Sequence, residues 1–367
     1  MTVLHLAANR WWTGSADPVI RLVNGLRARG HHVLLGVVRG DRFETKAREA
    51  GIEPLTTLDL RPRGWPGPIV RDVARLRGLI AREGVDLVHA HHSHDHWLGW
   101  LAARHAGRPV AIVRTFHNTR AVKADAVARW LYRRTAAVFA ASRGIEARLR
   151  DIGLDPARIA WIPGIADTGR FSSEVDDHAI RKEFGIGDAP LIVTVSRLAA
   201  NRGHEALLAG FRTALATMPE ARLMLVGKGE TRARLEALVG ELALRDRVMF
   251  AGYRDRDLPA VVRTADCFVL MGAGSDESCR AALEAMAAAR PVVARRVGAL
   301  PDTVVDGETG VLLDDDRADT IAAALVGVLA DPERAAAMGR AGRRRAETVF
   351  SAEHAVEIVE RVYRSLT

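Results

Sequence analysis

Short apolar runs alternate with helical patterns along almost the whole of this 367-residue chain, and no other feature constrains its fold as strongly. In the first half, runs with the length of buried strands occupy residues 3–6, 32–38, 85–90, 110–115, 137–141 and 159–162. Helical periodicity fills most of the intervals between them, for example at residues 19–29, 70–82 and 124–134. Strands that alternate with helices predict an α/β domain, in which helices cover both faces of a parallel sheet.

The alternation stops at residues 163–178 and then starts again. Further strands are expected at 191–196, 221–226, 248–251, 267–271, 291–294 and 311–313, with helices at 205–218, 230–244 and 258–265. Because the chain is also long enough for two domains, we predict two Rossmann-like, doubly wound parallel-sheet domains that face each other across a cleft. Ligands in such sheets bind at the carboxyl ends of the strands. The expected boundaries are 1–168, 169–345 and, for a C-terminal helix that packs back towards the first domain, 346–367.

The composition argues against several classes of protein. The chain has only two cysteines, Cys267 and Cys279, so we expect no disulfide framework. We expect the protein to work in a reducing compartment. The N-terminus lacks a signal-peptide pattern, and no apolar run approaches the roughly 20 residues that span a bilayer. The net charge of +8 has no accompanying nucleic-acid motif. We therefore expect a cytoplasmic protein whose partners are an anionic substrate or the anionic inner face of a membrane, and not nucleic acid.

One stretch of the second half, residues 274–287, predicts an anion site. It follows the buried run 267–271 and leads into a helix of strong helix formers, with Ser275 and Ser278 as candidate caps. A helix that starts at the end of a strand offers unpaired N–H groups and the positive end of its dipole to a phosphate. Glu284, about two turns into the helix, can accept hydrogen bonds from a pair of hydroxyls. The alternative is a capped amphipathic helix with a solvated Glu.

Two other strand ends of the second half carry residues suited to phosphate. Arg197 and Arg202 follow the strand at 191–196, and an arginine pair can clamp a diphosphate through its planar forks. Gly227 and Gly229 follow the strand at 221–226, where two glycines permit close backbone approach to a ligand. Tyr253, after the strand at 248–251, is a further candidate. Solvated surface arginines and an ordinary tight turn are the alternatives.

Three groups in the first half are candidates with weaker support. His117 follows the strand at 110–115, where an active-site histidine would lie, although single histidines are more often structural. A dense cluster comprises His89, His91, His92, His94, His96 and Asp95. A metal is conceivable there, but alternate residues of a strand point to opposite faces, so no metal site is predicted. The loop with Trp11, Trp12 and Gly14 either shields a cleft, touches a membrane, or packs against a neighbouring helix.

Together these motifs resemble the retaining glycosyltransferases of family 4, which have the GT-B fold. The resemblance covers nearly the whole chain and is strongest in the second half. The family's signature is a carboxylate, seven residues and then Glu, followed by Ala-Met-Ala and later Pro-Val-Val. Here it runs from Asp276 to Glu284, with Ala285-Met286-Ala287 and Pro291-Val292-Val293 after it. Its first acid is Asp instead of Glu, and Glu277, Cys279 and Arg290 replace three glycines.

Further family motifs have counterparts. The family's G-R-L-x-x-x-K-G is similar to residues 196–203, with Arg202 in place of Lys, and its active-site histidine matches His117. Its P-N-G-x-D hinge resembles residues 163–167, and G-H-x-V matches residues 30–33. The glycine-rich loop of the first half is reduced to Gly14.

The resemblance implies a role for each of these residues. Glu284 would hold the ribose of a UDP- or GDP-sugar, Asp276 would lie near the donor sugar, and N–H groups near Cys279 and Arg280 would meet the phosphates, beside Glu277 and Ser278. Arg197 and Arg202 would stabilise the leaving diphosphate, and His117 would orient the sugar. The first domain would bind the acceptor. No metal or other cofactor would be required.

The predicted activity is therefore retaining transfer of a sugar from a nucleotide diphosphate to an acceptor hydroxyl, in glycan, lipopolysaccharide or glycolipid synthesis. Two alternatives stay open: a sugar-nucleotide epimerase or hydrolase of the same fold, and a non-catalytic nucleotide-sugar binder. A lipid-linked acceptor would suit a basic protein at an anionic membrane. The segments 61–66 and 129–134, rich in Arg and Trp, are candidates for that contact.

Overall fold

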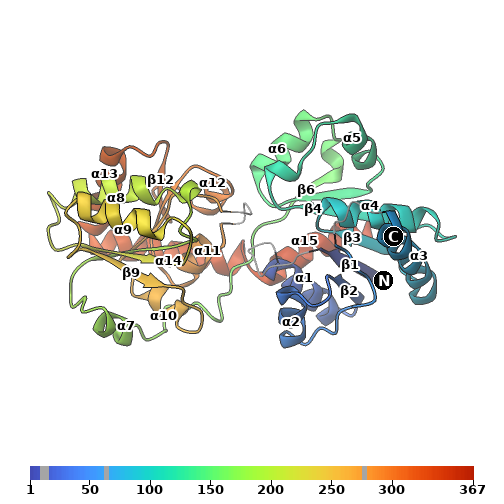
Figure 1. Cartoon of the computed structure of the whole chain (residues 1–367), viewed down its shortest axis with the longest axis horizontal. Coiled ribbons are helices and arrows are strands. Elements are labelled where there is room, and N and C mark those ends of the chain that lie inside the picture. The colour runs from blue at the N-terminus through green and yellow to red at the C-terminus, as the bar shows by residue number, and fades with distance from the viewer. Residues whose placement is uncertain (9–15, 62–65, 275–278) are drawn as a thin grey trace. The chain divides into compact units, whose positions relative to one another are not determined.

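The computed structural model describes residues 1–8, 16–61, 66–274 and 279–367, and its described residues form two compact units (Figure 1). The first unit consists of residues 1–164 and 352–367, and the second of residues 165–274 and 279–351. Each unit contains a six-stranded sheet in which all neighbouring strands are parallel. The predicted Rossmann-like α/β architecture is therefore confirmed for both halves of the chain.

The sheet of the first unit has the strand order β2-β1-β3-β4-β5-β6. Its strands are β1 (Thr2–Ala7), β2 (His32–Val37), β3 (Leu87–Ala90), β4 (Ala111–Phe116), β5 (Ala137–Ala140) and β6 (Ile159–Trp161). Its helices are α1 (Asp17–Ala28), α2 (Arg42–Glu49), α3 (Pro66–Glu83), α4 (Ser93–Arg104), α5 (Ala126–Tyr132), α6 (Arg143–Asp151) and α15 (Ala352–Arg364).

The strand period of two divides the core of this unit between the two faces of the sheet. Val3 and Ala7 of β1 pack on one face with α1 and with Tyr363 of α15. Leu4 and Leu6 pack on the other face with residues of α3 and α4. A polar residue at a central position of β1, β3 or β4 is thus buried beneath helices, whichever face it points to.

The last helix of the chain, α15, belongs to the first unit and lies beside the central strands of its sheet (Figure 1). It packs closely against α1, where a Cβ on Gly25 would lie 2.3 Å from Cγ2 of Val356. Glu360 accepts a hydrogen bond from Arg29 at 2.8 Å and pairs with His31 at 3.0 Å. The helix therefore places Tyr363 in the core on one face of the sheet, among residues that are far from it in sequence.

The sheet of the second unit has the order β12-β11-β10-β7-β8-β9. Its strands are β7 (Leu191–Val195), β8 (Arg222–Val226), β9 (Val248–Gly252), β10 (Cys267–Leu270), β11 (Val292–Arg295) and β12 (Gly310–Leu313). Its helices are α7 (His178–Glu183), α8 (His204–Ala214), α9 (Arg232–Glu241), α10 (Leu258–Arg263), α11 (Arg280–Ala287), α12 (Leu300–Thr303), α13 (Ala318–Leu329) and α14 (Pro332–Thr348). The strand order reverses between β7 and β10, which is where ligands bind in sheets of this kind.

Within the described residues, the twelve strands overlap the twelve predicted apolar runs, whereas several helices were not predicted. The helix α4 has a polar first turn with a capping box between His92 and Asp95, and it follows β3 directly. The chain ends with three helices, α13, α14 and α15, and α14 begins with Pro332 after the capping residue Asp331. No helix in the described parts of the chain is long and apolar enough to cross a membrane.

Candidate functional site

In the second unit, the loops that follow β7 and β8 are interlocked. Ser196 donates its N–H to the carbonyl of Val226 at 3.0 Å, and Leu198 donates to that of Lys228 at 3.1 Å. A Cβ on Gly227 would lie 2.0 Å from the carbonyl oxygen of Ser196, and one on Gly229 would lie 2.1 Å from that of Leu198. The close approach that these two glycines permit is therefore to the backbone of the neighbouring loop. Together they make the two loops one structure.

The loop that follows β10 joins the same assembly from the other side of β7. A Cβ on Gly203, whose φ is +71°, would lie 2.6 Å from Cβ of Met271. Gly272 in turn faces the carbonyl of Asn201, where a Cβ would lie 2.9 Å away. Because β7 and β10 are the two strands at the reversal of the order, the loops at the switch point contact each other directly.

Charged and aromatic side chains lie on this edge of the sheet. Arg197 pairs with Glu230 across the interlocked loops at 2.9 Å, and both side chains are largely exposed. The pKa of the Glu230 carboxyl is lowered by its own backbone N–H and by the Arg197 side chain. Tyr253, directly after β9, has an exposed ring, and Nζ of Lys228 lies 5.2 Å from the centroid of that ring. The edge therefore presents cations and an aromatic face together.

A contact between Ser196 and the buried His204 was not anticipated. The Ser196 hydroxyl lies 2.9 Å from Nε2 of His204, the first residue of α8. Burial, and secondarily the charge of Arg202, lowers the pKa of His204 to about 4, so the ring is neutral at physiological pH. The sequence signal that could have found this pair is the histidine directly after Gly203 at a helix start.

The helix α11 begins at Arg280 and has Cys279 as its N-cap, in the left-handed region with φ +51°. Nε of Arg280 lies 2.9 Å from a carboxylate oxygen of Glu284, whose side chain is only 6% exposed. Glu284 is therefore a buried, ion-paired carboxylate on the first turns of the helix, and not the solvated one of the alternative interpretation. Asp276, Glu277, Ser275 and Ser278 lie outside the described residues.

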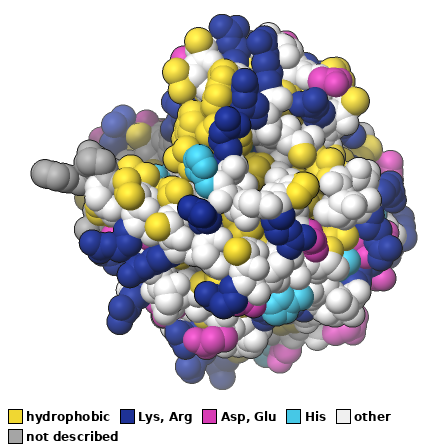
Figure 2. Space-filling view, turned by 90° about the vertical axis from the view of Figure 1, so that its right-hand side faces the viewer, with side chains coloured by type: hydrophobic (Ala, Val, Ile, Leu, Met, Phe, Trp, Pro, Cys, Tyr) yellow, Lys and Arg dark blue, Asp and Glu magenta, His cyan; other side chains and the backbone are white. Residues whose placement is uncertain are grey.

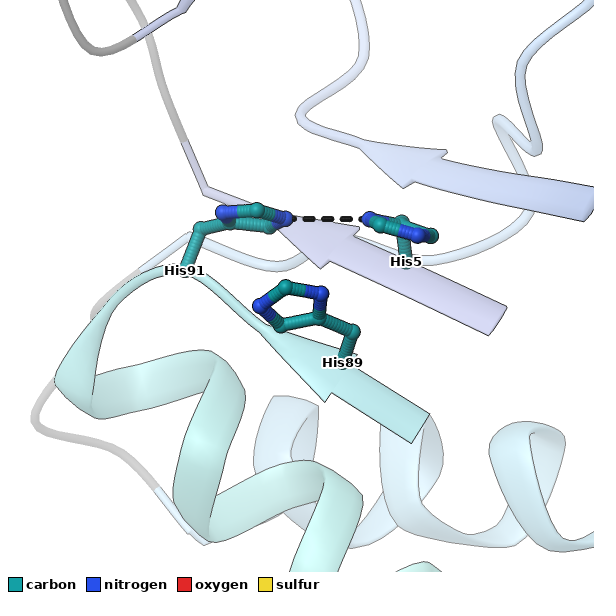
Figure 3. Close-up of side chains that lie close together, drawn as sticks. All are labelled: His5, His89 and His91. Atoms are coloured by element: carbon teal, nitrogen blue, oxygen red, sulfur yellow. Dashed lines mark hydrogen bonds between the residues drawn. The ribbon is translucent and has the colours of Figure 1, made fainter. Parts of the chain in front are cut away.

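In the first unit, His117 follows β4 and contacts His91. His91 belongs to a group of buried histidines with His5 and His89 (Figure 3). His5 on β1 and His89 on β3 are register partners, and Nδ1 of His5 lies 3.1 Å from Nε2 of His91. Nδ1 of His91 lies 3.3 Å from Nε2 of His117. Burial lowers the pKa of His117 and of His5 to about 3, which leaves both rings neutral. Sequence reasoning missed His5, although a histidine inside an apolar strand signals a buried polar contact.

The predicted cluster of histidines is divided between the two faces of the sheet. His96, on α4, contacts Thr135 at 2.8 Å and the buried Arg114 at 3.3 Å, on the opposite face from His89. Burial lowers the pKa of Arg114 to about 10, and its guanidinium lies 4.0 Å from the ring centroid of Phe116. Asp95, fully buried, accepts from the N–H groups of Ala8 and His92. The loop residues Trp11, Trp12 and Gly14 lie outside the described residues.

Comparison with known proteins gives matches in both halves. The family model for glycosyl transferases group 1 matches residues 176–345, and that for glycosyltransferase family 4 matches residues 13–170. A GDP-mannose-dependent alpha-(1-6)-phosphatidylinositol monomannoside mannosyltransferase of Mycolicibacterium smegmatis is 35% identical over 326 residues, covering 83% of this chain and 81% of the relative. A D-inositol 3-phosphate glycosyltransferase of Rhodococcus jostii is 32% identical over 305 residues, covering 77% and 67%.

The fold comparison agrees with these matches. The crystal structure of HepE from Anabaena in complex with UDP matches with a TM-score of 0.87 at 21% identity, covering the whole of both chains. The expected GT-B fold class is thus confirmed. Since family models match both halves and a relative of more than 30% identity spans four-fifths of the chain, this protein belongs to the group 1, family 4 glycosyltransferases and is a transferase.

Proposed function

We propose that this protein is a retaining glycosyltransferase that uses a nucleotide-diphosphate sugar as donor. The observation that carries the proposal is the assembly at the switch point of the second sheet, where three loops interlock beneath Arg197, Lys228 and Tyr253. Such an edge offers cations for phosphate and an aromatic ring for a base. The buried carboxylate of Glu284, with Arg280 beside it, supplies the acceptor for ribose hydroxyls.

In this proposal the second unit, expected at residues 169–345, binds the donor and stabilises its leaving group. Arg197, Arg202 and the N–H groups at the start of α11 face the charge that develops on the departing diphosphate, and fixed charges of this kind are a large source of catalysis. The donor phosphate would replace Glu230 as the partner of Arg197. Attack by the acceptor from the front face, assisted by the leaving phosphate, needs no dedicated base and no resident metal. Asp276 is assigned to the donor sugar on the family resemblance.

The first unit, expected at residues 1–168 with the helix of 346–367, would contribute His117 and the acceptor site. The two relatives named above act, by their names, on phosphatidylinositol monomannoside and on D-inositol 3-phosphate. Both acceptors contain inositol and phosphate. We therefore propose an inositol-bearing anionic acceptor, and GDP-mannose as the first donor to test, ahead of UDP-sugars. The loop with Trp11, Trp12 and Gly14 is assigned to the acceptor side.

A lipid-linked acceptor would require contact with a membrane from the cytoplasmic side, and the charge of the first unit supports this proposal. Asp59 is the only acid among the described residues that line a surface cavity of about 1030 Å³. The same cavity is lined by five arginines: Arg39, Arg61, Arg71, Arg75 and Arg82. In the view of Figure 2, Lys and Arg side chains stand out at more places than Asp and Glu. Of the two candidate segments, 61–66 contributes Arg61 to this cavity, and its residues 62–65 lie outside the described residues. The segment 129–134 is the weaker candidate because Trp130 packs against Trp97 and Trp100.

The donor proposal is tested by transfer assays with radiolabelled GDP-mannose and UDP-sugars against a panel of inositol-containing acceptors. Arg197→Ala should lower kcat/KM for the donor at least tenfold, about 1.4 kcal/mol of lost transition-state stabilisation. The matched control is Arg247→Ala. Arg247 also pairs with a glutamate, Glu220, but it precedes β9 and so lies at the opposite edge of the sheet. Near-normal kinetics of the Arg197 variant, or donor consumption without acceptor, would overturn the proposal.

The membrane proposal is tested by flotation with vesicles of pure phosphatidylcholine and with vesicles containing anionic lipid. Binding should require the anionic lipid and weaken as salt rises, because screened charges attract less. The double variant Arg71→Gln/Arg75→Gln should lose binding, while Arg247→Gln should retain it. Equal recovery with both vesicle types, or no binding at low salt, would count against membrane association.

A further inference from the structure

The histidines of the first unit form part of one continuous chain of hydrogen bonds that ends at His117. Starting from β4, the Thr115 hydroxyl lies 2.7 Å from Nε2 of His89, and Nδ1 of His89 lies 2.5 Å from the Tyr363 hydroxyl. That hydroxyl lies 3.4 Å from Nε2 of His5. The links from His5 to His91 and from His91 to His117 complete the chain. Five links thus join six side chains, which come from β1, β3, β4, α15 and the residues directly after β3 and β4.

The three histidines drawn in Figure 3 use every ring nitrogen in this chain. His5 contacts His91 and Tyr363, His89 contacts Thr115 and Tyr363, and His91 contacts His5 and His117. A cation bound by the triad would need a lone pair from each ring and would break several of these bonds. The nitrogens lie within 4.8 Å of one another, but the geometry is that of a hydrogen-bond chain.

The protons in such a chain must all run in the same direction. A neutral imidazole has one N–H and one bare nitrogen, and a hydroxyl has one proton. Burial lowers the pKa of His5, His89 and His91 and raises that of Tyr363, so each member carries a single mobile proton. The Tyr363 oxygen could also accept from both His89 and His5, but its own buried proton would then have no acceptor among the described residues, which contact this hydroxyl only through those two rings. Only two arrangements then satisfy all five links and also match the Tyr363 proton: either every bond is donated from Thr115 towards His117, or every bond is donated from His117 towards Thr115.

The buried end of the chain distinguishes the two arrangements. If Thr115 accepts from His89, its own hydroxyl proton needs another acceptor, and within the described residues the Thr115 hydroxyl contacts no acceptor other than His89. Thr115 is 4% exposed, so water does not readily supply one. A buried donor without a partner carries a substantial cost, whereas donation from Thr115 leaves every link matched.

We propose that this chain sets the tautomer of His117, so that Nε2 of His117 accepts from His91 and Nδ1 carries the proton. Thr115, His89, Tyr363, His5 and His91 are then positioning residues, and His117 presents a neutral N–H donor at the edge of the first unit. The catalytic value of that donor, a hydrogen bond to an oxygen of the transferred sugar, rests on the proposed function. The tautomer itself does not.

The test is long-range ¹H–¹⁵N spectroscopy of the full chain labelled in its histidine rings, with His117 assigned through His117→Gln. In the wild type, His117 should show a protonated Nδ1 and a bare Nε2, in at least about fivefold excess over the other tautomer, as follows from the cost of the orphaned hydroxyl. Thr115→Val keeps the shape of the side chain but removes the terminal donor. Both arrangements then leave one group unmatched, so the two tautomers should become nearly equal. Thr115→Ser should restore the wild-type spectrum.

A double variant separates the chain from a local packing effect. Tyr363→Phe cuts the chain between His89 and His5, so it should produce the same mixture at His117. Adding Thr115→Val to Tyr363→Phe should then change His117 no further, because Thr115 is already disconnected. A protonated Nε2 in the wild type, no change in Thr115→Val, or additive effects in the double variant would overturn the proposal. A correct tautomer in a protein that transfers no sugar would refute the proposed function alone.

Discussion

The contact between Gly229 and the neighbouring loop predicts how far an added methyl group at this position destabilises the second unit. In Gly229→Ala the new Cβ would lie 2.1 Å from the carbonyl oxygen of Leu198, and real Cβ atoms essentially never approach such an atom within 3.0 Å. The two loops must therefore separate by roughly 1 Å. The backbone conformation of Gly229 itself is accessible to alanine, since its φ is not in the left-handed region. The substitution thus tests the interlock and not local strain.

A separation of that size breaks two hydrogen bonds at this position. Leu198 donates to Lys228 at 3.1 Å, and Thr231 donates to Leu198 at 3.0 Å; both would exceed hydrogen-bond length. At a net 0.5 to 1.5 kcal/mol each, the loss is about 1 to 3 kcal/mol. For a unit of this size, each kcal/mol lowers the midpoint by about 2 to 4 °C. The expected fall in the Tm of the second unit is therefore about 2 to 12 °C.

Calorimetry with and without donor provides the assay. The control is Gly327→Ala, at an exposed helical glycine of the same unit with open space around its Cα, where alanine should stabilise slightly. Because Arg197 adjoins the displaced loop, kcat/KM should also fall about 100-fold, the usual cost of an ångström-scale displacement. A Tm within 1 °C of the wild type, together with normal kinetics, would refute the interlock as the basis of the site.

Three further predictions concern charge and protonation. Five histidines of the first unit have lowered pKa values, two of them at about 3, so the unfolded state binds more protons than the folded state below pH 6.5. The stability present above that pH should therefore be lost as the pH falls from 6.5 towards 3. The loss should reach up to about 1.4 kcal/mol per pH unit for each ring. Urea unfolding at pH 7.5 and pH 5, followed by circular dichroism, checks this, and equal stability at both would contradict it. Glu284→Gln should weaken donor binding about tenfold by titration calorimetry, because the neutral amide is a poorer acceptor for hydroxyls; unchanged affinity would remove Glu284 from the donor site. Glu360→Gln should destabilise the first unit by about 1 to 3 kcal/mol, since it weakens the bonds to Arg29 and His31, and a Tm unchanged from wild type would show that α15 is held by its apolar face alone.

The strands and the site edges were predictable because their signals are local. A buried parallel strand is a continuous apolar run, and the position of a loop at its carboxyl end follows from topology without any knowledge of contacts. The helix α4 was missed because its first turn is polar and its start is set by a capping box directly after β3. The pairing of Arg197 with Glu230 was likewise hidden, since it depends on which two loops become neighbours.

The histidine chain shows most clearly where local reasoning ends. The sequence placed His89, His91 and His96 in one cluster, whereas His96 lies on α4, which covers the opposite face of the sheet from His89. The true partners, His5, Thr115 and Tyr363, lie on elements far apart in the sequence. A buried histidine inside β1 was a sign that some partner must exist, but not which one.

Gly227 and Gly229 show that a sequence signal can indicate the right position without indicating which group makes the contact there. A glycine pair at the end of β8 predicted close backbone approach, and the approach is real, but the approaching group is the loop after β7. This changes the physical meaning of the motif. The loops that carry Arg197 and Lys228 are fixed to each other by these contacts, so the proposed binding of a diphosphate would not require the ordering of either loop. A rigid arrangement of charges is what stabilisation of a leaving group requires. In the proposed donor site, the glycines would therefore act by packing loop against loop.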